Sequence, residues 1–272
     1  MQGWRKILLE VVSLLISCVI AIPIYLVIVN SFKTGAEASD LGLSLPTKWS
    51  IWNNYTDVFV SAKIPQALWN TTILTVVSVF FIIIFCSLSA YFIQRRENRV
   101  SKLIQTIIIA GLILPSSIIT TYMLMFDLNL VRTYLGVILL YIAGNYAFLT
   151  YVYIGFFHSI PRELDEAAII DGVRPYGLFW RIIFPLLKPV SASVLIIAFM
   201  SVWNDFTTPF YFLNTASRFT LSLTVYFFFG QHSSDWNLVF ADIIIVSLPV
   251  VILYLFLQRY IVEGLTAGAV KS

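Results

Sequence analysis

Six long apolar runs, separated by shorter polar segments, dominate the pattern of hydrophobic and polar positions along the chain. None of them alternates apolar and polar residues as the strands of an outer-membrane barrel do. A spanning helix needs about 20 mostly apolar residues, and a helix satisfies all of its backbone hydrogen bonds within lipid. The pattern therefore predicts an all-α membrane protein with six transmembrane helices in a single domain, residues 1–272. The predicted spans are residues 7–29, 71–94, 103–126, 134–157, 189–213 and 240–258.

Composition supports a membrane location and argues against other classes. The chain of 272 residues is 59% hydrophobic and only 11% charged, whereas soluble domains average about 25% charged residues. A soluble globule could not bury so much apolar surface, so the surplus must face lipid or partners in lipid. The net charge of +3 comes without a long Lys/Arg run, which argues against nucleic-acid binding. Cys18 and Cys86 each lie inside an apolar run, where a disulfide framework is implausible.

Positive charge is unevenly distributed between the two sides of the predicted membrane domain. With a cytoplasmic N-terminus and six alternating spans, twelve of the 17 Lys and Arg residues fall in inside segments and five in outside segments. Cytoplasmic loops carry an excess of Lys and Arg. The sequence therefore predicts that both termini and the loop 158–188 are cytoplasmic. The run 7–29 is too long for a cleaved signal and lacks a small-residue exit, so we expect it to remain as the first span.

Prolines interrupt several of the apolar runs. Pro23, Pro115, Pro209 and Pro249 each remove a backbone donor and tend to kink a helix. Such bends are common as ordinary curvature of membrane helices, and they also occur in helices that line a cavity which opens and closes. The sequence leaves both interpretations open.

The loop 158–188 has the local signals of a short helix. Ser159 or Ile160 can cap it, and Pro161 then stands in its first turn, where a missing N–H is tolerated. Acidic residues follow early in the helix, where they suit the helix dipole. Gly172 ends the segment and lets the chain turn. Such a helix could lie on the lipid surface or dock a partner.

The spacing of residues within this loop favours docking. Glu166-Ala167-Ala168 is followed by Asp171 and Gly172, and after nine further residues by Ile182-Ile183-Phe184-Pro185. This arrangement resembles the EAA loop of the membrane subunits of ABC importers, except that Phe184 stands where the pattern has Leu. Further stretches resemble the carbohydrate-type permeases of the class of the maltose-system G subunit. These stretches are Ala67 to Thr71, Ile160 to Leu164, Trp203 to Phe206, Leu248 to Val250, Gln258 to Tyr260 and Gly264 to Lys271.

The resemblance implies a permease subunit with no chemistry of its own. It implies a second homologous permease subunit, two ATPase subunits that bind ATP and Mg, and an extracytoplasmic solute-binding protein, all at a bacterial cytoplasmic (inner) membrane. We find no phosphate-binding G-x-x-x-x-G-K-[S/T] motif, so we expect no cofactor on this chain. The implied solute is a sugar or oligosaccharide. The residues expected to dock the ATPase are Glu163, Glu166, Ala167, Ala168, Asp171, Gly172 and Pro185.

The resemblance also gives a role to the C-terminal segment. Residues 259–272 are expected to form a cytoplasmic tail after the sixth span. As a plain terminus this tail would be disordered and dispensable. Its likeness to the family's closing signature implies instead that Gly264, Gly268 and Lys271 reach the interface of the ATPase dimer.

Polar residues inside the predicted spans are candidates for a solute path, because intramembrane polar groups usually face a partner or a water-filled cavity. Asn204 and Asp205 lie in the fifth predicted span, and Asn145 in the fourth is a weaker candidate. A structural role for Asp205, as partner to a polar group on another helix, has equal standing. We expect Asp242, near the outer end of the sixth span, to lie at the membrane interface.

Other function classes compete with the importer subunit. A permease for a non-sugar solute would show the same motifs. An ion-driven secondary transporter normally has internal repeats and several charged groups near the midplane, and here only Asp205 lies deep. An intramembrane enzyme needs a nucleophile–base set or a metal-ligand helix. His158 and His232 lack ligand spacing, so the sequence predicts neither a catalytic group nor a metal site.

Overall fold

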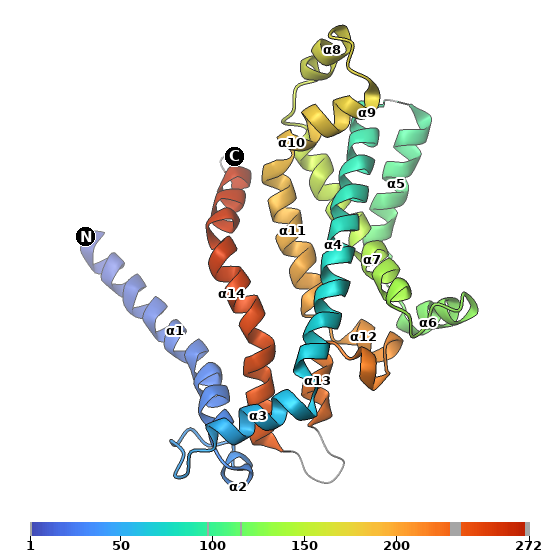
Figure 1. The fold of residues 1–272 in the computed structure, drawn as a ribbon. Coiled ribbons are helices and arrows are strands. Elements are labelled where there is room, and N and C mark those ends of the chain that lie inside the picture. The colour runs from blue at the N-terminus through green and yellow to red at the C-terminus, as the bar shows by residue number, and fades with distance from the viewer. Residues whose placement is uncertain (1, 97, 115, 229–234, 270–272) are drawn as a thin grey trace. The chain divides into compact units, whose positions relative to one another are not determined.

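The computed structural model describes residues 2–96, 98–114, 116–228 and 235–269, and the regular elements in these ranges are all helices (Figure 1). The chain forms two compact units. The first contains Met1–Trp69 and Phe219–Val251, and the second contains Asn70–Arg218 and Ile252–Ser272. The all-α prediction is confirmed for the described residues.

The first unit is held together by a buried polar cluster beside its apolar helices. Its helices are α1 (Gln2–Ser31), α2 (Gly35–Ala38), α3 (Ile51–Ser61), α13 (Leu221–Phe227) and the first part of α14 (Trp236–Ala269). The Asn54 side-chain amide donates to the carbonyls of Ser31 and Lys33, each at 2.8 Å. Asn237 donates to the Asn54 side-chain oxygen at 2.9 Å. These bonds satisfy polar groups that burial would otherwise leave unpaired, and they fix α3 against the end of α1.

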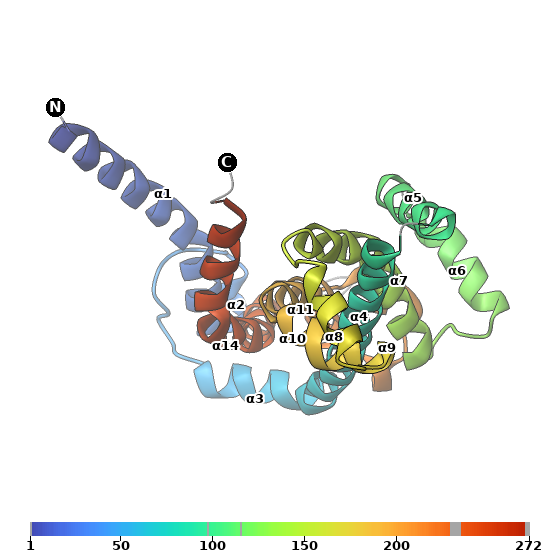
Figure 2. The same ribbon diagram turned by 90° about the horizontal axis from the view of Figure 1, so that it is seen from above.

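The second unit has an apolar core between long helices. Its elements are α4 (Ile64–Arg95, from Asn70 on), α5 (Arg99–Ile113), α6 (Ile118–Asp127), α7 (Tyr134–Phe157), α8 (Glu163–Ile170), α9 (Pro175–Gly177), η1 (Leu178–Ile183), α10 (Phe184–Leu186), α11 (Lys188–Trp203), α12 (Thr207–Phe212) and η2 (Ala216–Arg218). Helix α7 packs against both α5 and α11. Leu149 and Tyr153 of α7 are fully buried in this core with Ile183 and Val194. The short elements α8 to α10 lie at the end of the unit where α4 ends (Figures 1 and 2).

Among the described residues, three helices are long and apolar enough to cross a membrane by themselves. They are Lys6–Ser31 within α1, Ile64–Arg95 (α4) and Tyr134–Phe157 (α7). They correspond to the first, second and fourth predicted spans, and α7 has the bounds predicted for the fourth. The structure therefore confirms a helical protein with several apolar spans, whereas the count of six stays a prediction.

The third predicted span is two helices rather than one. Helix α5 ends at Ile113 and α6 begins at Ile118. Leu114, which precedes Pro115 in the sequence, is extended, with φ −71° and ψ 125°. A proline disfavours helical backbone at the residue before it, which accounts for the end of α5.

The fifth predicted span is also interrupted. Helix α11 ends at Trp203, and α12 runs from Thr207 to Phe212. On the other side of Leu187, the segment Pro175–Leu186 is bent by 77° from α11. Of the predicted span, only the part in α11 is a long helix.

The C-terminal segment does not separate from the last helix. Helix α14 continues to Ala269, so Gly264 and Gly268 are helical rather than part of an irregular tail. Lys271 lies outside the described residues. Pro249 lies inside α14 and Pro23 inside α1, and neither proline ends its helix.

Candidate functional site

The loop helix α8 begins two residues later than expected. Its first residue is Glu163, and the Arg162 carbonyl accepts the N–H groups of Asp165 at 2.9 Å and Glu166 at 3.2 Å. The Ser159 hydroxyl donates instead to the Phe156 carbonyl at 2.7 Å, at the end of α7. Ser159 therefore closes the preceding helix rather than capping α8, and Pro161 precedes the helix instead of standing in its first turn.

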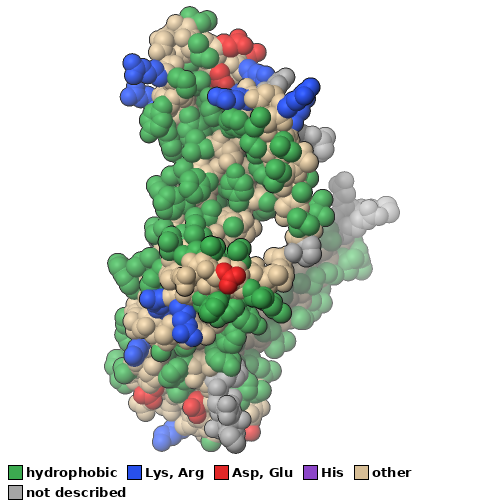
Figure 3. Space-filling view, turned by 90° about the vertical axis from the view of Figure 1, so that its right-hand side faces the viewer, with side chains coloured by type: hydrophobic (Ala, Val, Ile, Leu, Met, Phe, Trp, Pro, Cys, Tyr) green, Lys and Arg blue, Asp and Glu red, His purple; other side chains and the backbone are tan. Residues whose placement is uncertain are grey.

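The acidic residues lie in the first turn of α8, as predicted. Glu163, Asp165 and Glu166 all belong to this turn, and both glutamates are exposed. Negative charge near a helix N-terminus interacts favourably with the unpaired N–H groups there. The end of the loop thus presents two carboxylates to solvent, and Figure 3 shows charged side chains gathered at the same end of this unit, with mostly hydrophobic side chains over the helices below.

Gly172 closes α8 in a left-handed conformation, with φ +77°. The Gly172 N–H donates to the Ile169 carbonyl and the Val173 N–H to the Ala168 carbonyl, each at 3.0 Å. This pair of bonds is a Schellman motif, in which a glycine at positive φ satisfies the last carbonyls of the helix. An added Cβ at Gly172 would meet no atom within 4 Å. The requirement for glycine is therefore one of backbone conformation and not of local space.

The two alanines of the Glu166-Ala167-Ala168 triplet face opposite ways. Ala167 is exposed, whereas Ala168 is only 5% exposed and packs in the core cluster with Val173 beside it. Ala168 therefore anchors α8 to the unit, and of the two only Ala167 can be approached by a partner. The sequence did not distinguish these roles, because it does not show which side of a short helix meets the core.

Large apolar side chains surround this exposed face. Ile170 is 84% exposed and Tyr176 is 78% exposed, and Ile169 is also exposed. Exposed clusters of this kind mark interaction surfaces more often than isolated apolar residues do. Of the neighbouring aromatic residues, Phe179 is buried and Trp180 is half-buried, so Tyr176 is the one of the three that is exposed. Pro185 is exposed in α10.

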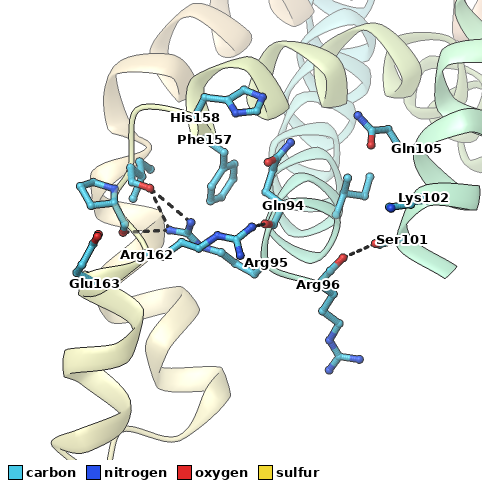
Figure 4. Close-up of a pocket in the computed structure, with 13 residues that line it drawn as sticks. Gln94, Arg95, Arg96, Ser101, Lys102, Gln105, Phe157, His158, Arg162 and Glu163 are labelled. Carbon is cyan, nitrogen blue, oxygen red and sulfur yellow. Dashed lines mark hydrogen bonds between the residues drawn. The ribbon is translucent and has the colours of Figure 1, made fainter. Parts of the chain in front are cut away.

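Arg95, at the end of α4, holds the start of the loop in place. Its Nε atom lies 2.6 Å from Oδ2 of Asp165, and its terminal nitrogens donate to the carbonyls of Ile160 and Pro161 at 3.4 Å. In the opposite direction, Arg162 donates to the Gln94 carbonyl at 3.1 Å (Figure 4). We call the contacts of Arg95 with Asp165 and these two carbonyls the Arg95 clamp.

Burial raises the pKa of the Asp165 carboxyl, and the neighbouring Arg95 opposes this shift. The ion pair is therefore a partial compensation for removing the carboxylate from water, rather than a source of large net stability. Arg95 was not among the predicted site residues, because nothing in the local sequence pattern links it to Asp165. The only available signal was a basic residue at the end of an apolar run and an acidic residue in a loop on the same predicted side.

Two of the three candidate path residues, Asn145 and Asp205, contact Tyr141 on α7. Asn145 donates to the Tyr141 carbonyl at 2.9 Å, within its own helix, and the Tyr141 hydroxyl shares a side-chain hydrogen bond with Asp205. Asp205 Oδ1 also accepts the Thr207 N–H at 2.9 Å. Asn204 is exposed at the end of α11. The structure thus brings α7 and the α11–α12 break together, and it shows that Asp205 has structural partners.

Asp242 is covered by protein side chains, and its expected position at the membrane interface stays a prediction. Its side chain is fully buried in the first unit, next to Thr224 of α13. The position of a residue along an apolar run gives its depth in the membrane but not the helices that pack against it.

Comparisons with known proteins give a consistent result. Residues 87–266 match the family described as binding-protein-dependent transport system inner membrane component. The chain is 35% identical to the probable starch degradation products transport system permease protein AmyC of Thermoanaerobacterium thermosulfurigenes, over 98% of both chains. It is 34% identical to the melibiose/raffinose/stachyose import permease protein MelC of Bacillus subtilis, over 100% of both. Its fold is similar to a chain of a bacterial ABC transporter involved in the import of alginate, with a TM-score of 0.82, 23% identity, and 94% and 95% coverage of the two chains.

Proposed function

Because the chain belongs to the family of binding-protein-dependent transport system inner membrane components, we propose that it is a permease subunit of an ATP-driven importer for a sugar or oligosaccharide. The family is a transport component and not an enzyme. Two full-length relatives above 30% identity carry names that refer to starch products or raffinose-type sugars, and this supports the proposed solute class. ATP and Mg would be bound by a separate ATPase.

The observation that carries the proposal is the geometry of α8. Its core side is fixed by Ala168, its end is closed by Gly172 at positive φ, and its solvent side presents Glu163, Glu166 and Ile170. A rigid helix with an exposed apolar and acidic face fits a docking surface for another subunit. We infer that an ATPase subunit docks here, against the residues predicted from the sequence, Glu163, Glu166, Ala167, Asp171, Gly172 and Pro185, with Ala168 supporting them from beneath.

The Arg95 clamp provides a route from this docking surface into the membrane. Movement of α8 would be passed to the end of α4 through Asp165 and to α11 through the bent segment Pro175–Leu186. Transport would then be a change between inward-open and outward-open states that ATP biases by favouring one of them. A second homologous permease subunit, two ATPase subunits and an extracytoplasmic binding protein complete the proposed complex.

Gly172 offers a direct test of docking. In the complex purified with its ATPase, Gly172→Val should lower sugar uptake at least tenfold while the subunit still inserts, because a β-branched residue at positive φ is strongly disfavoured. Gly172→Asn is the matched variant, since Asn tolerates this conformation, and it should keep most of the uptake. Gly155→Ala in α7, where an added Cβ meets nothing within 4 Å, controls for loss of a glycine in general. Undiminished uptake with Gly172→Val would refute the docking role.

The proposal for the C-terminal segment rests on the likeness of its sequence and on the course of α14. A helix that continues to Ala269 can carry Gly264 and Gly268 beyond the membrane toward an ATPase dimer, with Lys271 following in sequence. Deletion of residues 266–272 should lower solute-stimulated ATP hydrolysis about tenfold or more while the complex still assembles. A truncated complex with full stimulated hydrolysis and uptake would show that the segment is only a terminus.

A further inference from the structure

A basic pocket adjoins the proposed docking surface: Glu163 belongs to both, and Arg95 of the Arg95 clamp is part of the pocket lining. It has a volume of about 690 Å³ and is formed by the end of α4, the start of α5, the end of α7 and the residues that lead into α8. Lys102 of α5 lines one wall, and Arg95 and Arg162 line the opposite wall, as Figure 4 shows. Ile93, Phe157 and Ile160 are buried apolar residues at its base.

The charge of the pocket is predominantly positive. Its lining includes Arg95, Arg96, Lys102 and Arg162 and a single carboxylate, that of Glu163. Arg96 lies over the Phe92 ring, with its guanidinium carbon 5.0 Å from the ring centroid. Asp165 neutralises Arg95 through the 2.6 Å contact but does not line the pocket. The pocket is thus suited to an anion with several acceptor oxygens.

A second, apolar pocket opens between the same three helices. It has a volume of about 350 Å³ and is lined by Leu88, Ser89 and Phe92 of α4, Ile104 of α5 and Tyr146 of α7. On α4 these positions precede Ile93 to Arg96 of the basic pocket, and on α7 Tyr146 precedes Phe157. On both helices the apolar pocket therefore lies farther from the cytoplasmic helix end than the basic one. The two pockets are adjacent along α4, where Phe92 of the apolar pocket and Arg96 of the basic pocket lie one turn apart on the same side of the helix and in contact.

We propose that these two pockets together bind one anionic phospholipid, with the phosphate headgroup between Lys102 and Arg162 and an acyl chain against Phe92 and Ile104. Basic pockets between transmembrane helices on the cytoplasmic side are suited to acidic headgroups. A free phosphate would use only the basic pocket, and the adjoining apolar pocket favours the lipid. Leu103 and Ile107 of α5 are exposed apolar residues, which suits a helix that borders the bilayer.

This placement rests on the proposed cytoplasmic position of the loop 158–188. A headgroup bound there would contact Arg162 and Arg95, which join α4 to the start of the loop. Bound lipid would therefore brace the Arg95 clamp. The expected effect is a higher thermal stability of the assembled transporter in membranes that contain anionic lipid.

The test uses the complete purified transporter in detergent. It is titrated with phosphatidylglycerol or with phosphatidylcholine, and the amount of bound lipid and the thermal stability are measured at each step. Lys102→Gln should weaken phosphatidylglycerol binding about fivefold, since the attraction of a basic side chain to an anionic lipid headgroup beside it is on the order of that factor. Arg99→Gln is the matched control, because Arg99 is on α5 at the same end but does not line the pocket. We expect it to change binding by less than about twofold.

A second pair of variants separates a lipid from a free anion. Leu88→Trp or the milder Ile104→Phe should fill the apolar pocket and weaken binding of phosphatidylglycerol, but not any protection by inorganic phosphate. Equal protection by inorganic phosphate, unaffected by these variants, would identify a free-anion site and overturn the lipid assignment. If Lys102→Gln and Arg99→Gln lost phosphatidylglycerol binding equally, the lipid would be attracted by diffuse surface charge and the proposed pocket would be wrong.

Co-purification of the ATPase is recorded for every variant. If Lys102→Gln and Leu88→Trp leave lipid binding unchanged while the ATPase remains bound, the lipid proposal fails and the proposed function stands. If the unmodified chain binds no ATPase, the proposed function fails whatever the lipid result.

Discussion

At the residue scale, Asn204 and Asp205 are neighbours with different environments. Asp205 accepts backbone N–H groups at the start of α12 and bonds Tyr141, whereas Asn204 is exposed at the end of α11. Loss of a carboxylate that caps a helix costs about 1 kcal/mol. Asp205→Ala should therefore lower thermal stability, and Asp205→Asn should retain most of it because Asn also accepts such bonds.

Asn204→Ala is expected to leave stability nearly unchanged and to raise the solute concentration needed for half-maximal uptake severalfold, if Asn204 lines the path. Uptake by proteoliposomes and thermal unfolding in detergent measure the two effects separately. A normal uptake curve for Asn204→Ala would remove this residue from the path.

At the scale of elements, the Arg95 clamp fixes the loop to α4 together with the bond from Arg162 to the Gln94 carbonyl. Arg95→Gln removes the partner of a mostly buried carboxylate and weakens two further hydrogen bonds, which should cost about 1–3 kcal/mol. It also removes the influence that lowers the pKa of Asp165, so that burial raises this pKa further. A raised pKa in the folded state means that stability is present at low pH and is lost as pH rises through that pKa.

The stability of Arg95→Gln should therefore fall as pH rises above about 4, the ordinary pKa of an Asp carboxyl in an unfolded chain, and more steeply than that of the unmodified chain. The double variant Arg95→Gln/Asp165→Asn should lose this extra dependence, because Asn carries no charge to bury. Thermal unfolding across this pH range measures both. Parallel curves for the single and double variants would show that Asp165 is not the group responsible.

At the scale of the whole molecule, the proposed topology has six membrane spans and places both termini in the cytoplasm. The asymmetry of Lys and Arg, twelve of 17 on the inside, supports it. A reporter that works only outside the cytoplasm should be active when it is fused after residue 40. A reporter that works only in the cytoplasm should be active when it is fused within 158–188. Activity of an outside-only reporter within 158–188 would reject the orientation and, with it, ATPase docking on α8.

Much of this protein is determined by local sequence. The apolar run 134–157 becomes α7 with the same bounds, because a run of that length must form a helix in lipid. Gly172 was expected to turn the chain and has a positive φ, because glycine adopts this conformation without a Cβ clash. The acidic first turn of α8 follows from the helix dipole in the same way.

Only the tertiary structure decided which of these elements meet. Arg95 and Asp165 are 70 positions apart, and their pairing depends on how α4 and the loop pack. The breaks after Ile113 and Trp203 divide two runs that look continuous in composition, since a proline and a capping carboxylate act on backbone conformation rather than on hydrophobicity. The burial of Ala168 and Asp242 likewise depends on neighbours from distant segments. Hydrophobicity and backbone preference are properties of neighbouring residues, so they can be read along the chain. Which side of a helix is covered by other helices, and which charged residues pair, is determined only when the helices pack.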